Sequence, residues 1–136
     1  MSTPSILYLG TRVLAAIILL QTLYFKFTAS PESVYIFTRV GMEPWGRISI
    51  GILELVAAHF LIIGSTAWLG GLLALGLMAG AIMMHLTKLG ISVQGDGGYL
   101  FFLALAVSLC SLYVVFKNKH RILTLLKRAR TLGGIG

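Results

Sequence analysis

The sequence predicts an all-α membrane protein, a bundle of four transmembrane helices with both chain termini on the cytoplasmic side. The first observation is that 57% of the 136 residues are hydrophobic. The second is that only 11% are charged, whereas a soluble protein has roughly a quarter. The third is that the apolar residues form four runs. We expect one transmembrane domain, residues 1–116, followed by a basic cytoplasmic tail, residues 117–136.

The first apolar run covers about residues 6–27, and a helix of roughly 20 apolar residues is long enough to cross a bilayer. Arg12 lies in its first third, from where its long side chain can reach the nearer membrane surface. A cleaved signal peptide would be an alternative explanation. However, the run is longer than a signal core, and the candidate cleavage site after Ala29 has the bulky Phe27 where a small residue is needed. We therefore expect a true first span.

The segment after the first span, residues 28–47, is a polar loop. Within it, residues 33–41 are a candidate for a short helix on the membrane surface, because their aromatic side chains suit the depth of the lipid head groups. A glycine-rich loop precedes the last apolar run. The three remaining spans are expected at about residues 46–63, 67–86 and 99–116.

An even number of spans places both termini on the same side of the membrane. Six lysines and arginines follow the last span: Lys117, Lys119, Arg121, Lys127, Arg128 and Arg130. Because cytoplasmic segments carry an excess of such residues, this tail predicts that both termini face the cytoplasm. The leucines among the cations predict an amphipathic helix that contacts anionic lipid head groups. No aromatic residues for base stacking lie among the cations, so we do not expect nucleic-acid binding.

Three ionisable residues are the main candidates for a site, because such residues inside a span are rare and functional by default. Lys26 ends the first span, Glu54 lies about 10 Å into the second and His85 about 5 Å from the end of the third, at a rise of 1.5 Å per residue. They are expected to share one layer near the outer surface. Two interpretations stay open. One is a ligand-binding or proton-handling site, and the other is a structural clamp that fixes the register of the helices.

Three further polar residues are secondary candidates. Gln21 lies in the second half of the first span, and Asp96 precedes the fourth, where it suits a helix N-cap. His59 lies near the middle of the second span, about 18 Å beyond Arg47, and we expect it to be hydrogen-bonded within the bundle. A haem held by His59 and His85 is not expected, because their depths differ by roughly 13 Å.

Two glycines of the third span, Gly76 and Gly80, have the GxxxG spacing that lets another helix approach closely. They are expected to serve helix packing, either within the bundle or in a homo-oligomer. We expect no metal site, because no carboxylate–histidine spacing in the chain is typical of zinc or of a di-iron centre.

A family resemblance rests on Lys26, on the sequence GILE that ends at Glu54 and on the sequence AIMMH that ends at His85. In these residues the chain resembles the DoxX family of small bacterial four-span membrane proteins, over nearly all of its length through the fourth span. The resemblance implies a multi-pass protein of the bacterial cytoplasmic membrane. Relatives include the membrane subunit of a thiosulfate:quinone oxidoreductase and members of membrane oxidoreductase complexes that resist oxidative stress. The polar residues of the family correspond to Lys26, Glu54 and His85.

The leading hypothesis is a redox-associated membrane subunit that binds a quinone-like or other small amphipathic molecule. Glu54 would exchange a proton, His85 would hydrogen-bond a carbonyl oxygen, and Lys26 would keep Glu54 ionised or bind an anionic group. We expect no intrinsic cofactor, so a redox partner protein would supply the electron carrier. The alternative is a non-enzymatic scaffold or assembly factor in which the three residues form the clamp. A solitary transporter is not expected, because we find no inverted repeat.

Overall fold

A computed structural model describes residues 3–134, and in this part of the chain it contains helices and no strand. Among residues 3–134, four helices are long and apolar enough to cross a membrane. They are α1 (Thr3–Phe27), α3 (Trp45–Ile62), α4 (Ala67–Met84) and α5 (Tyr99–Lys117). The predicted fold class, an all-α bundle of four candidate transmembrane helices, is therefore confirmed. The side of the membrane on which the termini lie stays a prediction.

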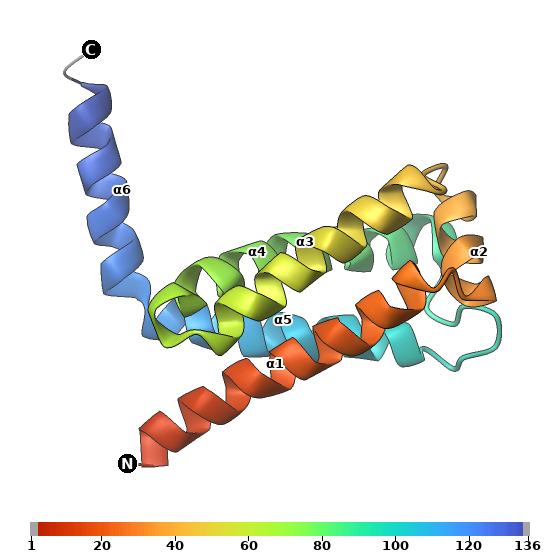
Figure 1. Ribbon diagram of the computed structural model, residues 1–136, viewed down its shortest axis with the longest axis horizontal. Helices are drawn as coiled ribbons and strands as arrows, with labels where there is room; N and C mark the ends of the chain where they lie inside the picture. Colours follow the sequence, from red (N-terminus) through yellow and green to blue (C-terminus); the bar gives the residue numbers. More distant parts are fainter. Residues whose placement is uncertain (1–2, 135–136) are drawn as a thin grey trace.

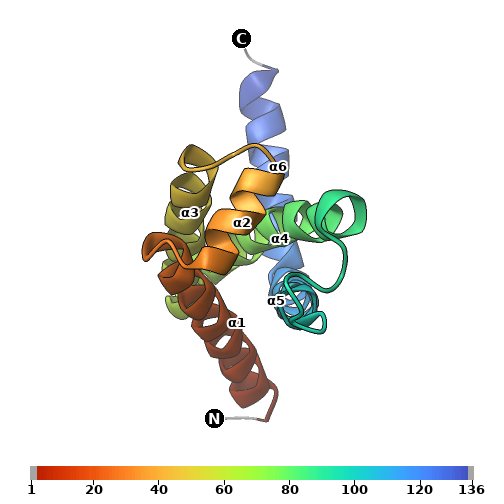
Figure 2. The same ribbon diagram turned by 90° about the vertical axis from the view of Figure 1, so that its right-hand side faces the viewer.

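The four spans form a closed ring, since α1 and α4 each pack against both α3 and α5 (Figure 2). Small side chains dominate the centre of this ring and let the helices approach each other. The fully buried residues of this kind are Ala15, Ala16, Ala57, Ala58, Ala67 and Ala74. Both ends of the described chain lie toward the end of the bundle opposite α2 (Pro31–Arg39), as Figure 1 shows. We call the other end, which α2 covers, the α2 end.

Close packing of α4 depends on Gly70 and Gly71. A Cβ atom added at Gly70 would lie 2.7 Å from the backbone nitrogen of Leu61, and one at Gly71 would lie 3.2 Å from Val114 Cγ1. A Cβ atom at Gly76 or Gly80 would meet nothing within 4 Å. The prediction that these two glycines pack against another helix is therefore not met within one copy of the chain, because both line an open cavity between the helices. Packing against a second copy stays a prediction.

Arg12 binds the C-terminal end of α3. Its side chain is buried, with 7% exposed. Its Nε donates to the carbonyl oxygen of Leu61 at 2.8 Å and its Nη2 to that of Ile62 at 2.7 Å. The last carbonyls of a helix lack partners within the helix and attract cations. The guanidinium therefore caps the C-terminus of α3, and the expectation that Arg12 reaches the nearer membrane surface stays a prediction.

Helix α2 is the short helix expected in the first loop, and it lies across one end of the bundle (Figure 2). The hydroxyl of Ser30 accepts a hydrogen bond from the N–H of Ser33 at 3.2 Å, and proline occupies the first turn. Both features favour a helix start at this point.

Three other short elements complete the described chain. Helix η1 (Gly64–Thr66) forms the bend between α3 and α4, and η2 (His85–Leu89) is one π-helical turn that continues α4. Helix α6 (Lys119–Gly133) extends away from the bundle and has no buried residue (Figure 1). Its leucines and cations are thus all available to a surface outside the bundle. Contact with anionic lipids stays a prediction.

Candidate functional site

A cavity of about 540 Å³ opens between the helices at the α2 end. Small-molecule sites in proteins have volumes of roughly 300–1,000 Å³ and mostly apolar walls. Residues of α1 to α5 and of η2 line it, and most of them are apolar. The polar lining residues are Gln21, Thr22, Lys26, Ser30, Glu32, Ser33, Glu54, His85 and Tyr99. All three main candidates from the sequence thus lie on one cavity.

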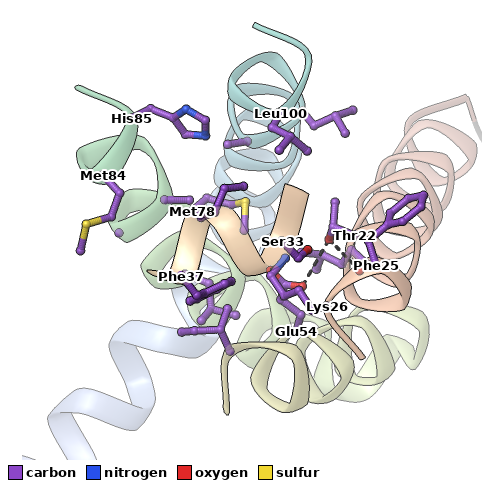
Figure 3. Close-up of a pocket in the computed structure, with 18 of the residues that line it drawn as sticks. Thr22, Phe25, Lys26, Ser33, Phe37, Glu54, Met78, Met84, His85 and Leu100 are labelled. Atoms are coloured by element: carbon purple, nitrogen blue, oxygen red, sulfur yellow. Dashed lines mark hydrogen bonds and ion pairs between the residues drawn. The ribbon is translucent and has the colours of Figure 1, made fainter. Parts of the chain in front are cut away.

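Lys26 and Glu54 form an ion pair on one side of this cavity, with 3.1 Å between Lys26 Nζ and Glu54 Oε1 (Figure 3). The side chain of Glu54 is 3% exposed and that of Lys26 is 15% exposed. The hydroxyl of Thr22 lies 3.2 Å from Glu54 Oε2 and 2.9 Å from the carbonyl oxygen of Leu19. Its single hydrogen can serve either acceptor. Each oxygen of the buried carboxylate therefore has a donor group within hydrogen-bonding distance.

The local sequence explains how these groups meet. Lys26 lies in the last turn of α1, and Thr22 lies one turn earlier on the same face. A Cβ atom at Gly51 would lie 2.6 Å from Phe27 Cε1. Glycine at this position therefore lets the end of α1 approach α3, and this approach brings Lys26 to Glu54.

Arg47 holds the same end of α1 from a second direction. Its Nε donates to both carboxylate oxygens of Glu43, at 2.9 and 3.0 Å, and its Nη1 donates to the backbone carbonyl of Lys26. This role of Arg47 was not predicted from the sequence. The four-residue spacing of Glu43 and Arg47 was the available signal for their pair, but nothing local indicated the bond to α1.

His85 lies on the other side of the cavity and is 5% exposed (Figure 3). Its Nδ1 lies 2.9 Å from the carbonyl oxygen of Gly90, and its ring packs edge-on against Phe101 at 5.6 Å between centroids. Within residues 3–134 it forms no hydrogen bond with Lys26 or Glu54. The three expected residues are therefore divided into an ion pair and a separate imidazole.

The hydrogen bond to Gly90 fixes the tautomer of His85. A carbonyl oxygen only accepts, so Nδ1 must carry a hydrogen. In the neutral ring Nε2 is then an acceptor. From the sequence, His85 is expected to donate a hydrogen bond to a carbonyl oxygen of a ligand. With Nδ1 engaged, only the imidazolium form has a second N–H for that purpose.

Gln21 and Tyr99 join α1 and α5 at the rim of the cavity. The amide Nε2 of Gln21 donates to the hydroxyl of Tyr99 at 3.1 Å, and both side chains are exposed. This secondary candidate from the sequence therefore lies on the cavity, with a partner from another span.

Asp96 organises the loop before α5 and is not a cavity residue. Its Oδ1 accepts from the N–H groups of Val93 and Gly98 at 2.9 and 2.8 Å, and its Oδ2 from that of Leu100 at 3.3 Å. Burial alone would raise the pKa of Asp96, but these hydrogen bonds and nearby His85 lower it below its ordinary value. Its carboxylate thus binds the first turn of α5, but the N-cap is Gly98, so the expectation that Asp96 is the N-cap was wrong.

Glu32 is a cavity residue that the sequence analysis missed. Its Oε1 is buried and has no hydrogen-bond partner among the described residues. Burial raises the pKa of Glu32 above its ordinary value, and the negative charge of Asp96 raises it further. An acidic residue in the first turn of a helix is common because the helix dipole favours it. For that reason its pattern in the sequence gave no sign of a place on a cavity.

His59 lies away from the cavity, on the exposed surface of α3. Its ring contacts that of neighbouring Phe60, with 6.4 Å between the ring centroids. The expectation of a hydrogen bond within the bundle was wrong, because α3 turns its small residues inward and this position outward. In residues 3–134 no group of three His, Cys, Asp or Glu side chains is placed to hold a metal ion.

Comparison with known proteins gives one family. The model of the DoxX-like family matches residues 10–112, a segment that runs from α1 into α5 and contains both the ion pair and the imidazole of the cavity. No curated protein and no solved structure matches the chain.

Proposed function

The chain belongs to the DoxX-like family, and we propose that it is a redox-associated subunit of the bacterial cytoplasmic membrane that binds a small amphipathic molecule of the quinone class. The observation that carries the proposal is the cavity at the α2 end. Its wall is largely apolar, but Lys26 and Glu54 lie on one side and His85 on the other (Figure 3). An apolar tail and a head group with two polar ends would both find partners there.

Each polar residue has a role in this proposal. The ammonium group of Lys26 has three N–H donors, of which one is directed at Glu54, so others can bind a ligand oxygen. Glu54 exchanges a proton with the bound head group, and His85 binds its far end. A partner protein supplies the electron carrier, and Arg47 keeps Lys26 in place through its backbone carbonyl.

A second candidate function is a scaffold or assembly factor in which the polar residues only fix the helices. The geometry of the Lys26–Glu54 pair favours it, because both carboxylate oxygens already have donors without a ligand. Breaking a buried pair on one side costs about 3–5 kcal/mol. In this alternative, the pair joins α1 to α3 and the cavity stays without a specific occupant.

Ligand retention in paired variants separates these functions. Wild type, Glu54→Gln and the control Glu43→Gln would be purified in mild detergent, and bound small molecules identified by mass spectrometry. Glu43 also forms an ion pair, with Arg47, but does not line the cavity. A quinone-class or other amphipathic molecule present in wild type and Glu43→Gln, and lost in Glu54→Gln, is the result expected for a binding site.

A charge exchange tests the clamp directly. In the variant Lys26→Glu/Glu54→Lys the ion pair is restored with its sign reversed. For a clamp, the exchange recovers the thermal stability lost in either single variant, and wild type carries no specific small molecule. That pair of results would refute the proposed binding function. For a binding site, the exchange leaves ligand retention lost even where stability returns.

A further inference from the structure

The unpaired polar atoms of the cavity show which hydrogen-bonding groups a ligand would have to supply. Nε2 of His85 is an acceptor in the neutral ring, because Nδ1 donates to Gly90. Nε2 has no hydrogen-bond partner in residues 3–134, and His85 lines the cavity. A ligand or water in the cavity can supply the donor that this acceptor lacks.

Glu32 provides a second unpaired acceptor on the same cavity. Its Oε1 is buried and without a donor in the described part of the chain. It belongs to α2, which packs against η2, the element that begins with His85. Asp96 lies within electrostatic range of both residues, but the backbone hydrogens of its own loop occupy its carboxylate. The two free acceptors therefore come from adjacent elements.

The side of the cavity with Lys26 and Glu54 offers hydrogen-bond donors instead of acceptors. Lys26 retains N–H donors beyond the one directed at Glu54, whereas both oxygens of Glu54 already have donors. A ligand oxygen on this side therefore meets a donor, and a ligand oxygen on the side of His85 and Glu32 meets acceptors. A carbonyl group satisfies only the first side. A hydroxyl group can accept on the first side and donate on the second.

We propose that the cavity selects an amphiphile whose head group donates hydrogen bonds, a hydroxyl group of the quinol or phenol type, over one whose head group only accepts. His85 and Glu32 are the residues that determine this specificity. The inference rests on the proposed function, and it replaces the carbonyl bond expected for His85 with an O–H donated to Nε2. A site that is built to bind a hydroxyl discriminates against an analogue without it, because its own polar atoms are then left unpaired.

The test is binding of a matched pair of probes to the protein in lipid nanodiscs. Decylubiquinol and decylubiquinone share tail and ring and differ in whether the head group donates; they would be titrated anaerobically. A redox-inert pair, 4-decylphenol and its methyl ether 4-decylanisole, repeats the comparison. The donor form of each pair is expected to bind roughly 10- to 100-fold more tightly, the effect of one or two unpaired buried acceptors.

Two variants assign the preference to residues. In His85→Asn the shorter amide can still donate to Gly90 while the Nε2 acceptor is lost, and in Glu32→Leu the second acceptor is lost. Each is expected to reduce the ratio of the two affinities by roughly tenfold, mainly by weakening the quinol. The control His59→Asn, at an exposed histidine outside the cavity, is expected to leave the ratio unchanged. Because the readout is a ratio within one preparation, a general loss of stability does not imitate it.

The outcomes distinguish this inference from the proposed function. Equal binding of both forms, or tighter binding of the quinone, overturns the selectivity and leaves the binding function standing. No binding of any of the four probes overturns both. A preference that persists in both His85→Asn and Glu32→Leu overturns the assignment to these two residues.

Discussion

Removal of Arg12 is expected to destabilise the bundle strongly. In Arg12→Met the carbonyl oxygens of Leu61 and Ile62 lose their charged donors at 2.8 and 2.7 Å. A hydrogen bond to a charged group contributes about 1.5–3 kcal/mol, and a cation over an aromatic ring about 0.5–1 kcal/mol. The guanidinium lies 5.1 Å from the centroid of Tyr8. We therefore expect a loss of about 3 kcal/mol or more in the free energy of unfolding.

The measurement is unfolding of the protein in mixed micelles, with helix content followed by circular dichroism. Arg12→Lys keeps the charge but not the two-pronged geometry, and it is expected to lose about half as much as the methionine variant. The control is Arg39→Met, because Arg39 is an exposed cation in the last turn of α2. If Arg12→Met unfolds within about 0.5 kcal/mol of wild type, a typical value for surface substitutions, the capping argument is refuted.

Three other expectations concern residues around the cavity and within the α4 interface. Glu32→Gln is expected to stabilise the protein at neutral pH, because the pKa of Glu32 is raised in the folded state. Wild type therefore loses stability as the pH rises from the ordinary value of 4.5 through the folded pKa. The same pH dependence of thermal stability in the variant and in wild type would contradict this. Asp96→Asn is expected to lose about 1–2 kcal/mol, because backbone N–H groups of the loop and of α5 lose a charged acceptor. Because the pKa of Asp96 is lowered, its contribution is present above the ordinary value of 3.8 and lost at lower pH. The stabilities of the variant and of wild type should therefore converge in acid. Gly70→Ala is expected to lose about 1–3 kcal/mol of stability, because the new Cβ atom meets the backbone nitrogen of Leu61. Gly76→Ala is expected to be neutral or slightly stabilising within one copy of the chain. Equal effects of the two variants in thermal unfolding would refute the packing argument.

The spans were predictable from the sequence because the bilayer requires long apolar runs, and this constraint acts locally along the chain. The meeting of Lys26 and Glu54 could also be anticipated, since depth along each helix follows from counting residues. Counting residues also placed His85 near the other two, but it could not show the partner of the imidazole. The helix changes to a π-helical turn at this residue, and the ring bonds to Gly90 instead of joining the ion pair.

The contacts that could not be predicted from the sequence depend on how each helix is rotated about its axis and on residues far away in the chain. Arg12 meets a helix terminus about fifty residues away. Gly70 and Gly76 are both glycines of α4, but only one of them faces α3, and spacing alone cannot say which. Glu32 reaches the cavity only because α2 lies across the end of the bundle (Figure 2).

The two sides of the cavity are expected to respond differently to mutation, so structural and binding roles can be measured separately. The Lys26–Glu54 pair is satisfied within the protein, so its removal affects both folding and any ligand. Nε2 of His85 and Oε1 of Glu32 have no hydrogen-bond partner in the described chain, so removing these two atoms breaks no hydrogen bond of the fold. We infer that the structural interpretation fits the first side and the binding interpretation the second. Loss of ligand without loss of stability is therefore expected at Glu32, and loss of both at Glu54.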